Sequence, residues 1–396
     1  MEQNALARTS FSTTVMWHPG AALVLLMSYF VLFGLTVGGQ SVLWAEIVRA
    51  LRMSEGVFGS AQLAPPLIGM MLLILGSPLT IRFGKKRLTI AGLITLGISS
   101  LGLAMANDVW EFVCALALSG LGFGAIEMAM NSATLDWEQQ TKRTVMNLMH
   151  AGFSGGAVIG ALATGWALQA GWTYVHVLVL LAALCVVALL ATLPVRYPPA
   201  APVHTSHTGT GAAVRLLFER RTLLALAALS MSGAIGESVA NTWSVIYLRD
   251  IGAAVIVGGA AYALFNGTMF AGRLANASFV ARFGPHTSLM ISGALVVVAG
   301  LLLMIPDSVL VAVVAFALAG LGVAGVVPTA LSEAAHRVPG GSGAVTGAVM
   351  AVTYLAFVVC APLIGWIAEL FSLRAALLMV ALSGVAILWL TRSVVR

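Results

Sequence analysis

The segment Ala115-Leu116-Ala117-Leu118-Ser119-Gly120-Leu121-Gly122 returns 200 residues later as Ala315-Phe316-Ala317-Leu318-Ala319-Gly320-Leu321-Gly322. Arg82-Phe83-Gly84 likewise recurs as Arg282-Phe283-Gly284, and Gly165-Trp166 recurs as Gly365-Trp366. Near the start of each half, Gly34 and Trp44 are matched by Gly233 and Trp243, in a register one residue shorter. Internal similarity over this length in an apolar chain indicates a duplicated bundle of helices in a membrane.

The composition excludes an ordinary water-soluble domain. Of the 396 residues, 60% are hydrophobic and 9% are charged, whereas roughly a quarter of the residues of a soluble domain carry a charge. Such a chain faces lipid, where only helices and closed barrels satisfy their backbone hydrogen bonds. The apolar runs are about 20 residues long and do not alternate, so they predict helices and not strands.

Twelve apolar runs are separated by Gly, Pro and charged clusters, and each predicts one membrane-spanning helix. The predicted fold class is therefore an all-α polytopic membrane protein with two parallel repeats of six helices. Cys114, Cys185 and Cys360 fall inside these runs, so they are expected to pack and not to form disulfides. The predicted spans are 20–45, 57–80, 88–106, 109–134, 144–168, 172–193, 221–247, 253–276, 286–305, 308–331, 342–367 and 372–393.

The basic residues predict how the helices are oriented. With a cytoplasmic N-terminus, sixteen of the twenty Lys and Arg residues fall on the cytoplasmic side. Only Arg49, Arg52, Arg249 and Arg374 fall outside. Cytoplasmic loops of membrane proteins show this excess, so both termini are expected in the cytoplasm. The net charge of +6 is then explained by topology, and no nucleic-acid partner is expected.

The longest polar interruption, residues 194–220, is rich in Pro, Ala, Thr, His and Gly and predicts a cytoplasmic linker. It divides the chain into an N-terminal bundle, 1–193, and a C-terminal bundle, 221–396. Because six is an even number, both bundles begin on the same side of the membrane and the repeats are parallel. His204 and His207 lie in this linker, but two histidines in a mobile segment predict no metal site.

The loop after the second span, residues 77–86, reads Ser-Pro-Leu-Thr-Ile-Arg-Phe-Gly-Lys-Lys and resembles the pattern G-x-L-a-D-r-x-G-r-k of the major facilitator family. Residues 277–284 form its counterpart after the eighth span. Ile81 and Ala281 stand where the pattern has its acid, so the resemblance does not extend to the acid-centred gating contact. The basic residues that remain, and that are expected at the gating or cytoplasmic loops, are Arg82, Lys85, Lys86 and Arg282.

Three further segments, 41–45, 128–131 and 146–156, resemble a bacterial subgroup of fucose-permease-like and largely uncharacterised inner-membrane carriers. This resemblance implies alternating access in the bacterial inner membrane and the import of sugars with protons. Two marks of proton-driven drug antiporters are absent, because Ala157 replaces a Pro of the fifth span and Leu116 an Arg of the fourth. Gly152, Gly156 and Gly160 recur every four residues and predict close approach of a neighbouring helix, on a surface where bundles can rock.

Acidic residues inside the predicted spans indicate a function, because inserting a carboxylate at the bilayer centre costs about 2.5–3.5 kcal/mol of free energy on insertion scales. Glu127 lies in the fourth predicted span and His150 in the fifth, both at a depth of roughly 10 Å by helical rise. A Glu–His pair at this depth could exchange a proton near neutral pH, so both are candidates for proton coupling. A purely structural hydrogen bond between the helices, or no contact at all, are the alternatives.

Other polar and aromatic residues inside the spans are candidates for the lining of a cavity. Amide, carboxyl and aromatic groups suit a sugar-like or amphipathic solute. Taken singly, a Trp near a helix end, such as Trp44, is more often an interfacial anchor, and a buried Asn more often joins helices. The predicted substrate contacts are Gln40, Asn131, Glu237, Asn241, Trp243, Asn266 and Tyr354.

These features predict a secondary active transporter for a small polar solute, and no enzyme is expected. Residues 152–156 match G-x-S-x-G, but an unbroken helix cannot form the elbow that this hydrolase motif needs. The sequence contains no P-loop, H-E-x-x-H or C-x-x-C, so no cofactor or metal is predicted. We expect a monomer whose partners are the solute, the proton and the lipid bilayer. An efflux carrier for an amphipathic or cationic compound and a non-transporting sensor are the alternatives.

Overall fold

The computed structural model describes residues 18–74, 76–198, 220–337 and 342–395, and helices are the only regular elements in these ranges. The predicted all-α fold class is confirmed. In chain order the helices are α1 (Pro19–Ala50), α2 (Glu55–Ala61), α3 (Ala64–Ile74), α4 (Gly76–Phe83), α5 (Lys85–Met105), α6 (Val109–Thr141), α7 (Met146–Gln169), α8 (Tyr174–Thr192), α10 (Arg221–Asp250), α11 (Val255–Leu302), α12 (Val309–Val323), α13 (Val326–His336), α14 (Ser342–Leu370) and α15 (Leu373–Val394).

Within the described residues, ten helices are long and apolar enough to cross a membrane, with α12 and α13 counted together. The 48-residue α11 holds two predicted spans, because Gly284 interrupts it with a φ of 80°. The second predicted span is divided among α2, α3 and α4. Its first break precedes Pro65 and Pro66, since proline starts a helix but cannot continue one. With α11 divided in two and α2–α4 as one span, all twelve predicted spans are accounted for.

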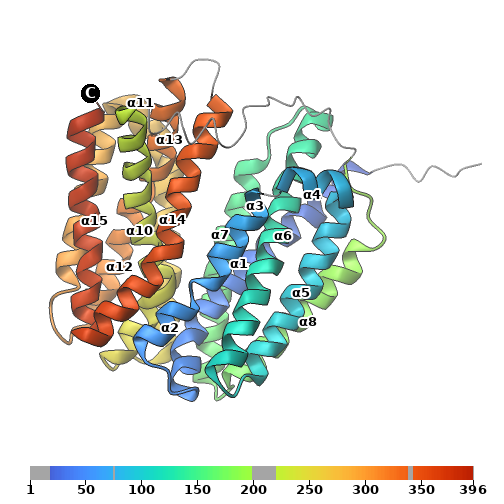
Figure 1. Ribbon diagram of the computed structural model, residues 1–396, viewed down its shortest axis with the longest axis horizontal. Coiled ribbons are helices and arrows are strands. Elements are labelled where there is room, and N and C mark those ends of the chain that lie inside the picture. The colour runs from blue at the N-terminus through green and yellow to red at the C-terminus, as the bar shows by residue number, and fades with distance from the viewer. Residues whose placement is uncertain (1–17, 75, 199–219, 338–341, 396) are drawn as a thin grey trace, which may run out of the picture.

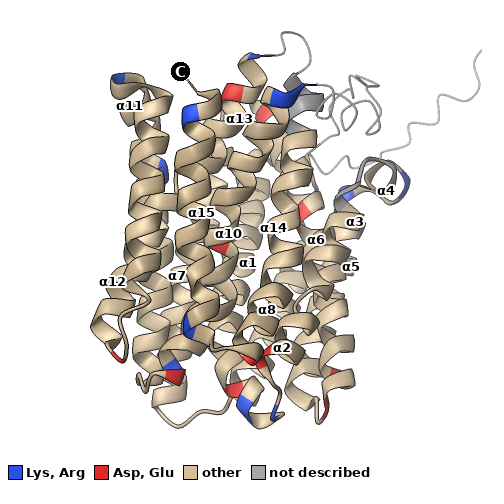
Figure 2. Cartoon of the chain, turned by 60° about the vertical axis from the view of Figure 1, so that its left-hand side comes forward, with Lys and Arg blue, Asp and Glu red and all other residues tan. Residues whose placement is uncertain are grey.

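The chain forms two bundles that lie side by side (Figure 1). Helices α1 to α8 make up one, and α10 to α15 the other. Charged residues gather at the two ends of the helices, and few lie between (Figure 2). Most of the expected linker, residues 199–219, lies outside the described residues, as do His204 and His207.

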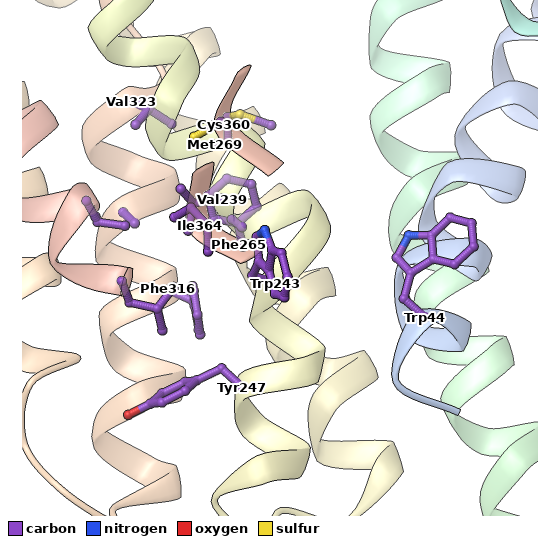
Figure 3. Close-up of a cluster of buried hydrophobic side chains, with 14 of the residues drawn as sticks. Trp44, Val239, Trp243, Tyr247, Phe265, Met269, Phe316, Val323, Cys360 and Ile364 are labelled. Atoms are coloured by element: carbon purple, nitrogen blue, oxygen red, sulfur yellow. The ribbon is translucent and has the colours of Figure 1, made fainter. Parts of the chain in front are cut away.

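One cluster of buried hydrophobic side chains extends through both bundles. On the C-terminal side it contains Trp243, Tyr247, Phe265 and Phe316, and Trp44 of α1 lies across from them (Figure 3). Trp44 is 7% exposed and Trp243 is 1% exposed, so neither is the interfacial anchor that its position near a helix end suggests. Their rings belong to the packing between the bundles.

The glycine stripe of α7 packs against α1 of the same bundle. A Cβ on Gly156 would collide with the Val31 carbonyl oxygen, and one on Gly160 with the Leu35 carbonyl oxygen. The predicted close approach is therefore confirmed, but the expectation that this stripe is a surface between rocking bundles is wrong.

Other glycines form the contacts between the bundles. A Cβ on Gly59 of α2 would lie 2.5 Å from the Ala361 carbonyl oxygen and 3.1 Å from Gly365 Cα, both on α14. A Cβ on Gly259 of α11 would lie 2.7 Å from the Ala161 carbonyl oxygen and 3.3 Å from Gly165 Cα, both on α7. Each position in one crossing has its equivalent 200 residues away in the other. The repeat in the sequence is thus a repeat in the packing.

Polar contacts join the bundles at the end where α2 lies, which we call the closed face. The Arg249 guanidinium donates to Glu46 Oε1 at 3.2 Å. The Glu369 carboxylate accepts from Ser54 Oγ at 2.7 Å and from the Gly56 N–H at 2.9 Å. Because each bond runs from one bundle to the other, these contacts hold this face together.

Candidate functional site

A cavity of about 350 Å³ lies between the two bundles. Both bundles contribute to its wall, through α1, α3, α6, α7 and Gln62 between α2 and α3 on one side, and through α10 and α14 on the other. Its lining residues are Phe33, Val37, Gln62, Pro65, Pro66, Gly69, Gly120, Phe123, Gly124, Glu127, Phe153, Glu237, Ser238, Asn241, Thr242, Tyr354, Phe357 and Ala361. Four residues predicted from the sequence therefore line it, namely Glu127, Glu237, Asn241 and Tyr354.

Aromatic rings dominate the wall of the cavity. Phe33 of α1 packs edge-on against Phe123, with ring centroids 4.8 Å apart, and lies 5.6 Å from Phe153. Tyr354 and Phe357 bring two more rings from α14. Sequence analysis missed the phenylalanines, because a Phe in an apolar helix carries no sign of which face it occupies. The rings offer flat apolar surfaces to a solute.

Glu127 is hydrogen-bonded across the cavity. Tyr354 Oη donates to Glu127 Oε1 at 3.1 Å, which links α6 of one bundle to α14 of the other. Among the described residues, no basic side chain forms an ion pair with Glu127. Its carboxyl group therefore lies in an apolar wall with a neutral hydroxyl as its partner.

Glu237 has a different environment. The Arg273 guanidinium, on α11, donates to Glu237 Oε2 at 3.1 Å. Arg273 was counted from the sequence only as a cytoplasmic charge. Its place inside the predicted span 253–276, three residues before the end, was the signal that could have marked it as part of the site.

His150 does not pair with Glu127 among the described contacts. Its ring packs edge-on against Phe30, with ring centroids 5.4 Å apart. Glu127 reaches across to Tyr354 because α6 faces α14 over the cavity, whereas His150 lies on α7 beside α1. Of the alternatives weighed for this pair, the absence of a direct contact is the one that the geometry matches.

Two predicted amides bond to the backbone of their own helix. Asn131 donates to the Glu127 carbonyl oxygen at 2.8 Å, and Asn266 donates to the Tyr262 carbonyl oxygen at 3.1 Å. Asn241, in contrast, lines the cavity and accepts from Tyr262 Oη at 3.0 Å. Gln40 and Trp243 are buried beyond the cavity lining.

The basic loop residues form local contacts. Arg82 lies over the Phe83 ring at 5.3 Å and Arg282 over the Phe283 ring at 5.2 Å, so the repeated motif repeats its geometry. Lys85 forms an ion pair with Asp136 of α6, and Lys86 donates to the Val195 carbonyl oxygen at 2.9 Å. Asp136 thus supplies an acid beside a loop in which the family pattern's own acid is missing.

No group of three His, Cys, Asp or Glu side chains that could hold a metal ion occurs within the described ranges. The polar groups that line the cavity are a few carboxyl, amide and hydroxyl side chains, and Arg273 pairs with one of the two carboxyl groups. Such a site can bind and orient a solute and hold a proton.

Comparisons with known proteins identify the family. Residues 22–356 match the model of the Major Facilitator Superfamily. An uncharacterised transporter, y4wD of Sinorhizobium fredii, is 29% identical over 364 residues, covering 89% of this chain and 93% of its own. The fold is similar to the nucleoside transporter NupG, with a TM-score of 0.80 at 14% identity, covering 94% of this chain and 98% of that one. It is also similar to a variant of the E. coli fucose:proton symporter FucP, with a TM-score of 0.60 at 17% identity, covering 94% and 98%. The chain therefore belongs to the Major Facilitator Superfamily, a family of membrane transporters, and is not an enzyme.

Proposed function

We propose that this transporter moves a small polar solute, sugar-like or otherwise ring-shaped, and couples its movement to protons at Glu127. The observation that carries the proposal is the 3.1 Å hydrogen bond between Tyr354 and Glu127, since it joins the two bundles inside the cavity. Hydrogen bonds to a charged carboxylate are stronger than those to a neutral acid. Gain or loss of a proton at Glu127 would therefore change the strength of this link between the bundles.

The chemistry of the cavity supports the class of solute. A volume of about 350 Å³ lies at the small end of the range for ligand pockets. Aromatic rings stack on the faces of a ring-shaped solute, and Asn241 and Glu237 can bond its hydroxyl groups. By their names, one fold neighbour carries nucleosides and another carries fucose with protons, and both kinds of solute contain a hydroxylated ring.

In this proposal the N-terminal bundle, 1–193, rocks against the C-terminal bundle, 221–396, about the linker 194–220. His150 serves proton movement from its exposed position on α7, and Arg82, Lys85, Lys86 and Arg282 act at the gating loops. The protein lies in the bacterial inner membrane with both termini in the cytoplasm, which rests on the distribution of Lys and Arg.

The experiment that tests proton coupling replaces Glu127 by Gln in the full chain, reconstituted in proteoliposomes. Glu127→Gln keeps a hydrogen-bond acceptor for Tyr354 but cannot release a proton. We expect the variant to lose concentrative uptake driven by a pH gradient and to retain solute counterflow, which needs no net proton movement. Asp307→Asn is the matched control, because Asp307 lies 83% exposed in a loop. Unchanged accumulation by Glu127→Gln would remove the coupling role.

A second function, efflux of a cationic amphipathic compound, is favoured by one observation. Glu127 lacks an ion-pair partner among the described residues, so a cationic solute would supply the missing charge beside aromatic rings. Cells lacking the protein distinguish the two functions. Loss of an exporter makes them sensitive to the compound, whereas loss of an importer prevents growth on it.

A further inference from the structure

Three buried N–H groups near the cavity have no hydrogen-bond partner among the described residues. They are Gln40 Nε2, Gln62 Nε2 and Trp243 Nε1. Their residues are 5%, 8% and 1% exposed, and they come from both bundles. Buried polar groups in proteins are nearly always paired, so three exceptions in one region call for an explanation.

The same three groups share a position relative to an aromatic cluster. The rings of Trp44, Phe58, Phe112 and Trp243 form this ring cluster, in which Phe58 lies 5.4 Å from Trp243 and 6.1 Å from Trp44. It packs α1, α2 and α6 of one bundle against α10 of the other. The ring cluster therefore lies between the cavity and the closed face.

Each unpaired donor lies at the boundary between the cavity and the ring cluster. On α1, Val37 lines the cavity, Gln40 follows in the next turn, and Trp44 belongs to the ring cluster. Gln62 lines the cavity itself, one turn after Phe58 of the ring cluster. We call Gln40, Gln62 and Trp243 the donor floor; Gln62 lines the cavity, and Gln40 and Trp243 lie behind its lining.

Trp243 completes this arrangement from the other bundle. Its neighbour in sequence, Thr242, lines the cavity, while its own ring packs edge-on against Phe58. The donor floor is thus assembled from three helices only when the bundles are in contact. A ligand that fills it would touch both of them.

The donor floor has hydrogen-bond donors that lack acceptors. All three unpaired atoms are nitrogen donors, and the matching group is an oxygen that accepts hydrogen bonds and carries no proton. A hydroxyl group can also accept from these donors, but it must place a proton of its own, whereas a carbonyl oxygen has two acceptor positions and a carboxylate has more. A carboxylate or a carbonyl oxygen fits the requirement.

We propose that the donor floor binds a carbonyl oxygen of the solute, either in a carboxylate or in a neutral amide or ring carbonyl, while the solute's ring lies against the aromatic wall. This inference rests on the proposed transport function and narrows it to ring compounds that bear such a group. Gln62, on the break between α2 and α3, is the residue that it adds to the binding site.

The first experiment compares probes that share a ring and differ in one group. The purified full chain is melted with benzoate, benzamide or benzyl alcohol, and the dissociation constants are obtained from the concentration dependence of Tm. We expect benzoate or benzamide to bind tighter than benzyl alcohol, by roughly threefold to tenfold for each hydrogen bond gained. A preference for benzoate assigns the site to carboxylates, and one for benzamide to neutral carbonyls. Equal binding of all three, or no shift with benzoate and benzamide at millimolar concentration, overturns the proposal.

Two variants distinguish donors that bind a ligand from donors that are unpaired for structural reasons alone. Gln62→Leu and Trp243→Phe each remove an unpaired donor. Gln62→Leu nearly keeps the volume of the side chain, so the Tm of the ligand-free protein should stay the same or rise, whereas Trp243→Phe also removes buried ring atoms and should lower Tm. In both variants the preference for the carbonyl probe should fall by roughly threefold to tenfold. A lower Tm of Gln62→Leu, or an unchanged ranking of probes in both variants, would show that the donors are structural, which contradicts the proposal.

The matched control is Trp137→Phe, the same substitution at a tryptophan whose Nε1 donates to the Pro19 carbonyl oxygen at 2.8 Å. This variant should melt at a lower temperature and rank the probes as the unchanged chain does. This experiment and the Glu127→Gln experiment test different claims. If Glu127→Gln still accumulates solute, proton coupling at Glu127 is wrong, but the expected order of probe affinities is unaffected. If the probes bind equally, the carbonyl site is wrong, but Glu127 can still couple transport to protons.

Discussion

Two acids face the same cavity in different surroundings. Glu237 forms an ion pair with Arg273 at 3.1 Å, whereas Glu127 is bonded to the Tyr354 hydroxyl. A proton can therefore exchange at Glu127 without breaking an ion pair among the described residues, which is the physical reason for proposing coupling there.

The Glu237–Arg273 pair should behave as a unit. Glu237→Gln and Arg273→Gln each leave one charge without its partner, so each should lower Tm. The double variant should be less destabilised than the sum of the two, by about 1 kcal/mol, because Arg273 is partly exposed. Thermal unfolding of the four proteins measures this coupling.

The control for that cycle is the pair between Arg374 and Asp307, whose atoms are 2.9 Å apart but whose acid is 83% exposed. Water screens such a pair, so the corresponding cycle should give a coupling near zero. Additive effects of the two substitutions at Glu237 and Arg273 would show that this ion pair contributes nothing to the site.

At the scale of the helices, closure depends on two crossings without side chains between the backbones. Gly59 meets Gly365 where α2 crosses α14, and Gly165 meets Gly259 where α7 crosses α11. Small residues allow this approach in a membrane, where van der Waals contact drives helix association. A Cβ at Gly59, Gly259 or Gly365 would lie 2.5, 2.7 or 2.3 Å from a carbonyl oxygen of the other bundle, so a larger side chain there must push the bundles apart.

Gly365→Leu should therefore open the closed face. Overpacking costs about 1–3 kcal/mol, which changes the population of a two-state equilibrium roughly fivefold to a hundredfold. A cysteine introduced by Ala45→Cys, at a position 3% exposed between the bundles, reports the change. It should react faster with a membrane-impermeant maleimide in the Gly365→Leu background. Cys114, which is exposed, is first replaced by serine.

Gly155→Leu is the control for that measurement, because a Cβ at Gly155 meets nothing within 4 Å. It should leave the labelling rate of Ala45→Cys unchanged. Equal labelling of the Gly365→Leu and Gly155→Leu proteins would mean that the crossing does not hold the face closed.

The sequence predicts the helices but not which helices pack together. Apolar runs predict the helices because each span must satisfy its backbone alone in lipid, and this is a local property. Which helix packs against which is not a local property of the sequence. The α7 glycines predict a close neighbour, but nothing in their spacing distinguishes α1 of the same bundle from a helix of the other.

Part of the candidate site could also be predicted from the sequence. Glu127, Glu237, Asn241 and Tyr354 line the cavity, and they could be found because polar groups in apolar helices are rare. The bond from Tyr354 to Glu127 spans 227 residues, so only the packed structure reveals it. Gln62 lies inside the predicted span 57–80, so the same rule could have found it, but only the structure shows that α2 ends there and that its side chain lines the cavity.

At the scale of the whole molecule, the polar contacts of the closed face and the distribution of charge define two different ends. The closed face carries Arg49 and Arg249 together with Glu46 and Glu369. The opposite ends of the helices carry the basic loop residues around Lys85 and Arg282. This asymmetry underlies the proposed orientation in the membrane.

Reporter fusions test that orientation. Green fluorescent protein, which does not fluoresce after export through the general secretory pathway, should be bright when fused to either end of the chain. Alkaline phosphatase, which is active only outside the cytoplasm, should be active when inserted after Asp307, in the loop before α12. Opposite results for the amino and carboxyl ends would exclude an even number of spans.

The paired glycine crossings carry a consequence for the origin of the molecule. Position 59 of the first half meets position 365 of the second, and the equivalent position 259 of the second half meets position 165 of the first. Contacts that exchange in this way are those of an isologous interface, the kind that joins identical subunits about a two-fold axis. By these two crossings alone, two copies of one six-helix half would meet about a two-fold axis in the way that the two halves of this chain do.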